Sequence, residues 1–84
     1  MKQPKEILSI HDYGDTVCDR YTFVLRKRFY PTNPGFHPHL GTSENGLGIS
    51  MFGECLRGKH LGKRVTWESL SKELQNHVAE RLKP

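Results

Sequence analysis

The chain has 84 residues, of which 35% are hydrophobic and 26% charged, so we expect one small domain over residues 1–84. This length leaves no room for a second domain. The first residues lack the apolar run of a signal peptide, and no stretch approaches the roughly 20 apolar residues that span a bilayer. We therefore expect a cytoplasmic protein.

Positive charge is concentrated in two blocks, within a formal net charge of +4. Residues 20–43 contain no carboxylate, and this stretch includes Arg26, Lys27 and Arg28. Carboxylates are also missing from residues 55–67, which contain Arg57, Lys59, Lys63 and Arg64. Such runs are commonly solvated surface, but their segregation makes an anionic partner the functional alternative.

The first half of the chain predicts a β-hairpin. Residues 6–11 have the composition of a short strand, and Asp12 and Gly14 belong to a turn sequence. Residues 17–29 should form the return strand, because Tyr21, Phe23 and Leu25 alternate with other residues at a period of two.

Three prolines then predict a long loop over residues 30–43, because proline donates no hydrogen bond to a sheet. Residues 47–52 alternate again and predict a third strand, although its glycines weaken it. Residues 53–62 should form a connection, and residues 63–67 a fourth strand.

The C-terminal segment predicts a helix over residues 70–82. Leu70, Leu74, Val78 and Leu82 recur every four residues, and Ser71 is suited to the N-cap position. The expected fold is therefore α+β, with a small antiparallel sheet of three to four strands and one C-terminal helix packed on a face. The expected core comprises Phe23, Leu25, Ile49, Val65, Leu74 and Val78.

Residues 53–59 match the G-x-x-x-x-G-K spacing of a phosphate-binding loop. His60 nevertheless stands where that loop needs Ser or Thr to hold magnesium, and a strand is predicted to follow in place of a helix. A glycine-rich nest of backbone amides that accepts a single phosphate is the more credible interpretation.

Metal and cofactor chemistry find little support. His37, His39, Cys18, Cys55 and His60 are residue types that bind zinc, but the cysteines lie 37 positions apart and form no close pair. We therefore predict no bound metal and no cofactor, and we expect two free thiols.

Catalytic signatures are also missing. The sequence contains no Gly-x-Ser-x-Gly elbow, and neither cysteine lies in a recognised catalytic signature. The acidic residues near the predicted turn are suited to solvated or capping roles. We therefore predict a protein that is not an enzyme.

Several motifs resemble a known family of small uncharacterised proteins from bacteria, phages and other mobile elements. Members share a D-R-Y-T strand, a loop containing S-E-N-P, and an H-L-G-K-R strand before a leucine-rich helix. Asp19-Arg20-Tyr21-Thr22, Ser43-Glu44-Asn45 and His60-Leu61-Gly62-Lys63-Arg64 are similar to these motifs, and the likeness covers residues 19–82. The chain departs from the family at Gly46 and Ser71, where proline is frequent. The resemblance implies a similar fold and a mobile-element context, but no catalytic residues.

Three functions are open as hypotheses. The first is a basic nucleic-acid-binding module, in which cations contact phosphates and Tyr30, Phe36 or Trp67 stacks on bases. The second is an inhibitor or regulator that binds a host nucleic-acid-processing protein through the proline-rich loop, and the third is a small metal-dependent enzyme. The candidate binding residues are Arg26, Lys27, Arg28, Phe36, Arg57, Lys59, His60, Lys63 and Arg64.

Overall fold

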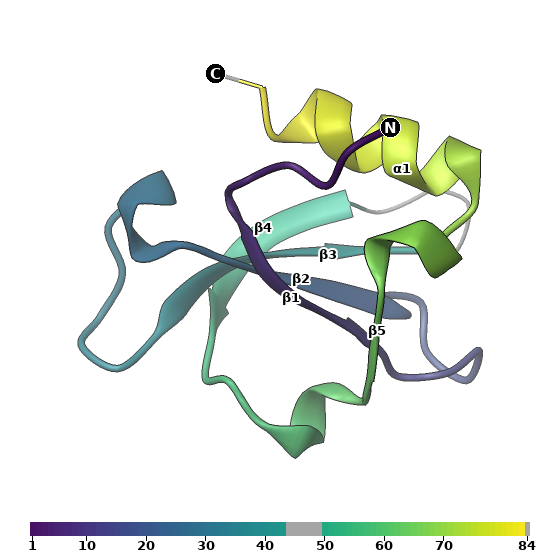
Figure 1. The fold of residues 1–84 in the computed structure, drawn as a ribbon. Coiled ribbons are helices and arrows are strands. Elements are labelled where there is room, and N and C mark those ends of the chain that lie inside the picture. Colours follow the sequence, from purple (N-terminus) through teal and green to yellow (C-terminus); the bar gives the residue numbers. More distant parts are fainter. Residues whose placement is uncertain (44–49, 84) are drawn as a thin grey trace.

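The computed structural model describes residues 1–43 and 50–83 and has an α+β fold (Figure 1). Five strands form one antiparallel sheet in the order β4-β3-β2-β1-β5, and helix α1 covers one face of it. The strands are β1 (Ile7–Asp12), β2 (Tyr21–Leu25), β3 (His37–Thr42), β4 (Ser50–Cys55) and β5 (Lys63–Val65). The helices are α1 (Lys72–Arg81) and the 3-10 turns η1 (Lys27–Phe29), η2 (Lys59–Leu61) and η3 (Trp67–Ser69). Of these described helices, none is long and apolar enough to cross a membrane.

The predicted hairpin is present as β1 and β2, which pair antiparallel. Its turn contains Gly14 at a φ of 99°, a backbone conformation that glycine adopts without steric cost. The return strand is shorter than the predicted residues 17–29. The backbone N–H of Arg26 donates to the Glu6 carbonyl, and the chain then winds into η1.

The prediction of a loop over residues 30–43 was wrong in its second half, where β3 lies between β2 and β4. Pro38 is buried within this strand and lies opposite Glu54 of β4. The ladder between β3 and β2 ends with His39 opposite Val24, so Pro38 lies beyond it. Proline is tolerated there because it lies in only one of the two ladders.

Two other predicted boundaries change. Gly53 and Cys55 belong to β4, so the connection to β5 starts later than predicted, while residues 47–49 lie outside the described part. The fourth strand ends at Val65, and Trp67 opens η3 with its side chain only 1% exposed. Trp67 is therefore a core residue and is not available to stack on a base.

A β-bulge determines which side chains of β1 face the helix. The register shifts between Ile7, opposite Leu25, and Ser9, opposite Val24. Ile7 and Ile10 consequently share the face that packs under α1, although three positions separate them. Ser9 and His11 are left on the opposite face of the sheet.

The core lies between the sheet and α1. Phe23, Leu25, Leu74 and Val78 are buried there as predicted, Val65 packs against them half-buried, and Ile49 lies outside the described residues. Further buried members are Ile7, Ile10, Tyr21, Leu40, Trp67, Leu70 and Leu82. The predicted N-cap is confirmed, since the Ser71 side chain accepts a hydrogen bond from the Leu74 N–H at 3.2 Å.

Candidate functional site

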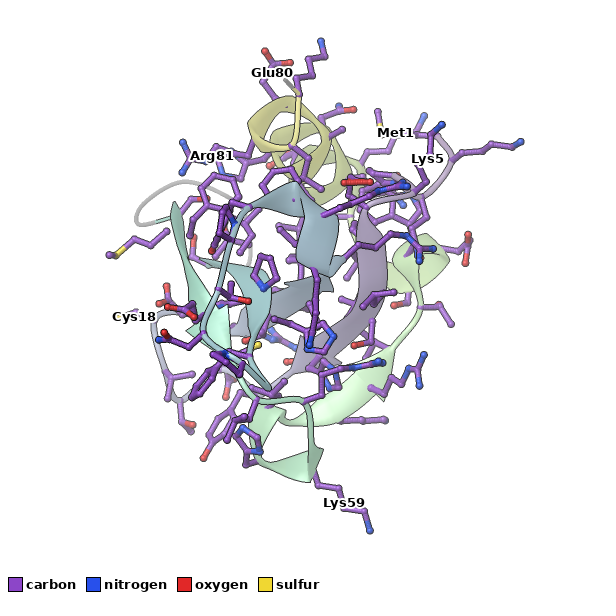
Figure 2. All side chains as sticks on the ribbon, turned by 90° about the vertical axis from the view of Figure 1, so that its left-hand side faces the viewer. Met1, Lys5, Cys18, Lys59, Glu80 and Arg81 are labelled. Carbon is purple, nitrogen blue, oxygen red and sulfur yellow. The ribbon has the colours of Figure 1, made fainter. Side chains whose placement is uncertain are left out.

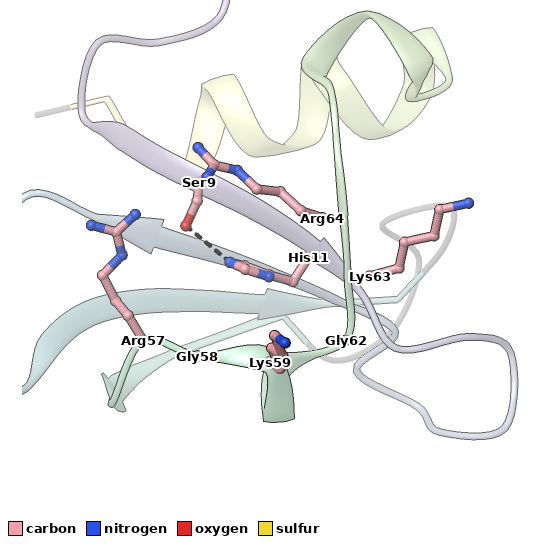
Figure 3. A pocket seen from close by; sticks show the side chains of 8 residues that line it. All are labelled: Ser9, His11, Arg57, Gly58, Lys59, Gly62, Lys63 and Arg64. Atoms are coloured by element: carbon pink, nitrogen blue, oxygen red, sulfur yellow. Dashed lines mark hydrogen bonds between the residues drawn. The ribbon is translucent and has the colours of Figure 1, made fainter.

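The sheet face turned away from α1 carries an open pocket with a volume of about 740 Å³ (Figure 3). Strands β1 and β5 form one side of it, and the connection between β4 and β5 forms the other. We call it the basic pocket. Its lining residues are Ser9, His11, Arg57, Gly58, Lys59, Gly62, Lys63 and Arg64.

Ser9 and His11 form the floor of the basic pocket. They are two positions apart on β1, so both side chains point to the same face of the sheet. Ser9 is 4% exposed and His11 8% exposed, and Ser9 Oγ lies 2.9 Å from His11 Nε2 in a hydrogen bond. The other ring nitrogen of His11, Nδ1, is buried and makes no hydrogen bond of normal geometry with the described residues, although the Gly62 backbone also interacts with the ring.

The walls of the basic pocket carry only positive charge. Four of its lining residues, Arg57, Lys59, Lys63 and Arg64, are basic, and none is acidic. All four side chains are exposed, and none forms a hydrogen bond or ion pair with another described residue. Figure 2 shows Lys59 at the end of the molecule opposite Glu80 of α1. The pocket therefore presents uncompensated positive charge to solvent.

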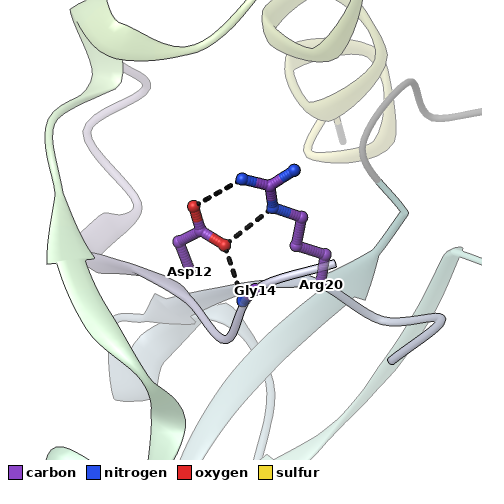
Figure 4. Close-up of polar contacts among 3 residues, drawn as sticks. All are labelled: Asp12, Gly14 and Arg20. Atoms are coloured by element: carbon purple, nitrogen blue, oxygen red, sulfur yellow. Dashed lines mark hydrogen bonds and ion pairs between the residues drawn. The ribbon is translucent and has the colours of Figure 1, made fainter. Parts of the chain in front are cut away.

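Asp12, a carboxylate beside β5, is bound by Arg20. Asp12 lies opposite Lys63 in the ladder between β1 and β5. Its Oδ1 accepts hydrogen bonds from Arg20 Nε at 2.8 Å and from the Gly14 N–H at 2.9 Å, and its Oδ2 accepts one from Arg20 Nη2 at 3.0 Å (Figure 4). These bonds, first of all the one from Arg20, hold the pKa of Asp12 below its usual value. The charge of Lys63 also lowers the pKa of Asp12, but the direct ion pair of Asp12 is with Arg20.

The electrostatic surroundings keep the His11 ring neutral near pH 7. Burial lowers the pKa of His11, and the positive charges of Arg64 and Arg57 lower it further, while the backbone of Gly62 acts in the opposite direction. A neutral imidazole carries one proton, so one ring nitrogen donates and the other accepts. The floor is thus polar but uncharged beneath a ring of cations.

The two glycines of the pocket have different roles. Gly62 adopts a φ of 107°, and a Cβ at this position would lie 2.6 Å from the Asp12 carbonyl oxygen. Glycine is therefore required for the connection to pass over β1, whether or not a ligand is bound. A Cβ on Gly58 would instead meet only the His60 side chain, at 3.0 Å.

The other predicted binding residues lie outside the basic pocket. Arg26 Nε donates to the Lys5 carbonyl at 2.6 Å, and Arg28 Nε and Nη2 donate to Glu6 Oε1 at 3.0 and 2.9 Å. These two arginines tie the N-terminal segment to η1. His60 is exposed on η2 beside the pocket and contributes to the lowered pKa of His11.

Lys27 extends the positive surface beyond the pocket. Burial lowers the pKa of His37, and the charges of Lys27 and Arg57 lower it further. Lys27 and Arg57 therefore both act on His37 through their charge. Phe36 is half-buried before β3, where its carbonyl accepts a hydrogen bond from Thr32 Oγ1 at 2.8 Å.

The potential zinc ligands do not assemble into a site. His37 lies opposite Cys55 in the ladder between β3 and β4, but no group of three or more His, Cys, Asp or Glu side chains within residues 1–43 and 50–83 is placed to hold a metal. Cys18 is exposed and Cys55 is buried, and both are free thiols. Burial raises the pKa of Cys55.

Sequence reasoning missed Ser9 and His11. They alternate with apolar neighbours in a predicted strand, a pattern that is typical of any half-buried strand. Their role depends on β5, which lies more than 50 positions away in the chain and places Arg64 opposite His11. The available signal was a pair of polar side chains on one face of a strand, which is weak without knowledge of the strand order.

Comparison of the chain with protein-family models, with curated proteins and with solved structures gave no match in any of the three. The motif resemblance to mobile-element proteins is therefore still a prediction. A function for this chain has to be inferred from the charge, burial and hydrogen bonding of the basic pocket itself.

Proposed function

We propose that this protein is a small basic non-enzymatic module that binds the phosphate backbone of nucleic acid through the basic pocket. One observation carries the proposal: the lining of the pocket contains four exposed basic residues and no acidic one. Neutralising phosphates with Lys and Arg releases condensed counterions and supplies most non-specific affinity for nucleic acid. Because the motifs resemble those of mobile-element proteins, the proposed setting is an accessory protein of a phage or mobile element.

The alternative of a protein-binding inhibitor rested on a long proline-rich loop. Half of that segment is strand β3, and the remainder is held in place because the Asn33 N–H donates to Glu54 Oε1 at 2.6 Å and Thr32 bonds the Phe36 carbonyl. A fixed, half-buried Phe36 offers little apolar surface to a partner. The positive pocket is therefore the stronger basis for a function, and protein binding becomes an outcome of the test.

The test is a titration of labelled duplex and single-stranded oligonucleotides at several salt concentrations. A plot of log affinity against log salt should have a slope of about −0.9 per duplex contact or about −0.7 per single-strand contact. Three phosphate contacts would give slopes of about −2 to −3. Lys63→Ala should weaken binding almost equally across sequences and flatten the slope by about one contact.

Lys72→Ala is the matched control, because it removes the same charge from an exposed position at the start of α1, behind the sheet. It should leave the affinity and the slope nearly unchanged if binding is local to the pocket. No measurable binding at low salt would end the proposal. If the chain instead binds one protein tightly, and Lys63→Ala leaves that binding unchanged, the inhibitor hypothesis is favoured.

A further inference from the structure

We propose that the basic pocket receives a terminal phosphate monoester, the phosphorylated end of a nucleic acid strand, in preference to an internal phosphodiester. This inference rests on the proposed function and specifies which part of the nucleic acid enters the pocket. It is carried by the form of the pocket, by its charge and by the Ser9–His11 pair at its floor.

The form of the pocket favours the end of a strand. The sheet closes it from below at Ser9 and His11, and the β4–β5 connection with Arg57 and Lys59 stands against it on one side (Figure 3). An internal phosphate must enter and leave together with its two neighbouring sugars. A terminal phosphate needs only one path of approach, which a pocket with a closed floor provides.

The charge of the pocket also favours a monoester. A phosphodiester carries one negative charge, whereas a phosphate monoester carries about −1.5 to −2 at pH 7 and presents three strong acceptor oxygens. Arg57, Lys59 and Arg64 line the pocket, and none of them forms an ion pair with a described carboxylate. Lys63 lies at the rim, with its side chain turned away from the floor (Figure 3). The two arginines can each donate two parallel hydrogen bonds to phosphate oxygens.

The floor supplies a donor that a solvated cationic surface does not have. When His11 carries its proton on Nε2, the ring donates to Ser9 Oγ, and the Ser9 O–H is free to donate to a phosphate oxygen. When the proton is on Nδ1, Ser9 donates to the ring, and the buried Nδ1–H faces the protein and not the pocket opening. The tautomer with its proton on Nε2 is therefore the one that offers a phosphate oxygen a donor at the floor, the Ser9 hydroxyl.

The experiment compares four oligonucleotides of one sequence, each with an internal fluorescent label. Two carry a phosphate at the 5′ or the 3′ end, one has hydroxyls at both ends, and the last is a hydroxyl-ended strand two nucleotides longer. The longer strand matches the net charge of the phosphorylated ones, so any remaining difference measures recognition of the end. We expect one of the phosphorylated strands to bind about tenfold more tightly than the longer strand.

Variants then locate the preference. Ser9→Ala removes the floor hydroxyl. Arg57→Gln removes a wall cation whose side chain makes no hydrogen bond with the residues that the structure describes, so this second variant keeps the test valid if Ser9→Ala fails to fold. Each should reduce the preference for the phosphorylated end to less than about threefold, by loss of a charge-assisted hydrogen bond. Lys72→Ala should keep the preference intact.

The outcomes separate the two proposals. Equal binding of the phosphorylated and charge-matched strands, both weakened by Lys63→Ala, overturns the end preference while nucleic-acid binding stands. Binding of a nucleoside monophosphate with no binding of any strand supports a monoester pocket and overturns the nucleic-acid function. If neither the strands nor the monophosphate bind, both proposals fail.

Discussion

Gly62 combines a left-handed backbone conformation with a close approach to the Asp12 carbonyl oxygen. Gly62→Val should therefore destabilise the fold by roughly 2–4 kcal/mol, from backbone strain and from overlap with β1. The measurement is urea unfolding followed by circular dichroism. Loss of nucleic-acid binding in this variant would say nothing about backbone contacts to phosphate unless the fold is shown to be intact.

Gly58→Ala is the comparison for Gly62→Val in the same connection. Gly58 has an extended backbone, and its added methyl group would meet only the side chain of His60, which can rotate away. We expect a cost below about 1 kcal/mol for this change. If Gly58→Ala and Gly62→Val lower the free energy of unfolding by similar amounts, the backbone of Gly62 does not carry the strain described above.

Among the elements, α1 stabilises the fold through one row of side chains pressed against the sheet. Leu74→Ala should cost roughly 2–5 kcal/mol, because Leu74 is 1% exposed and a small domain collapses poorly around the cavity. Asn76→Ala changes an exposed position of the same helix and should alter stability by less than about 0.5 kcal/mol. An alanine variant at position 74 as stable as the parent would contradict the packing described for α1.

The elements also show where sequence patterns suffice. Helix α1 was predictable because its apolar spacing and its Ser71 cap are local features. Strand β3 was not, because Pro38 is an argument against a strand until one knows that only β4 pairs beside it. The local sequence pattern therefore predicts the α+β class and the helix, whereas β3, the strand that was not predicted, depends on tertiary pairing.

One part of the candidate site could be predicted from the sequence, and the other part could not. Lys59, Lys63 and Arg64 are close in sequence, so their clustering could be predicted from composition alone. The floor formed by Ser9 and His11 could not, because the bulge near Leu8 decides which side chains of β1 face the helix. A strict period of two would have placed Ile7 on the same face as Ser9 and His11.

For the whole molecule, one buried and two half-buried histidines predict how stability depends on pH. Burial is the main cause that lowers the pKa values of His11, His37 and His39 below the ordinary value of 6.5. The unfolded chain therefore binds protons first as pH falls, so stability should be flat above about pH 7 and decrease below about pH 6.5. Asp12, with its lowered pKa, should add a further loss in the acid range below 3.8.

Urea unfolding at pH values between 3 and 8 measures this dependence. Replacing His11 and His39 together with glutamine should flatten the loss between pH 6.5 and 5, since two of the three shifted groups are then gone. A parent protein equally stable at pH 5 and at pH 7.5 would rule out this linkage.

The buried Trp67 has a consequence for following the molecule in solution. It is the only tryptophan of the chain, its Nε1–H donates to the Met1 carbonyl at 3.0 Å, and its own carbonyl accepts a hydrogen bond from Gln75 Nε2 at 2.9 Å. Its indole thus lies in the core on the helix side of the sheet, whereas the basic pocket opens on the other side. Tryptophan emission should therefore shift to longer wavelength when the core opens and stay nearly constant when the pocket fills, so one intrinsic optical signal distinguishes unfolding from occupancy.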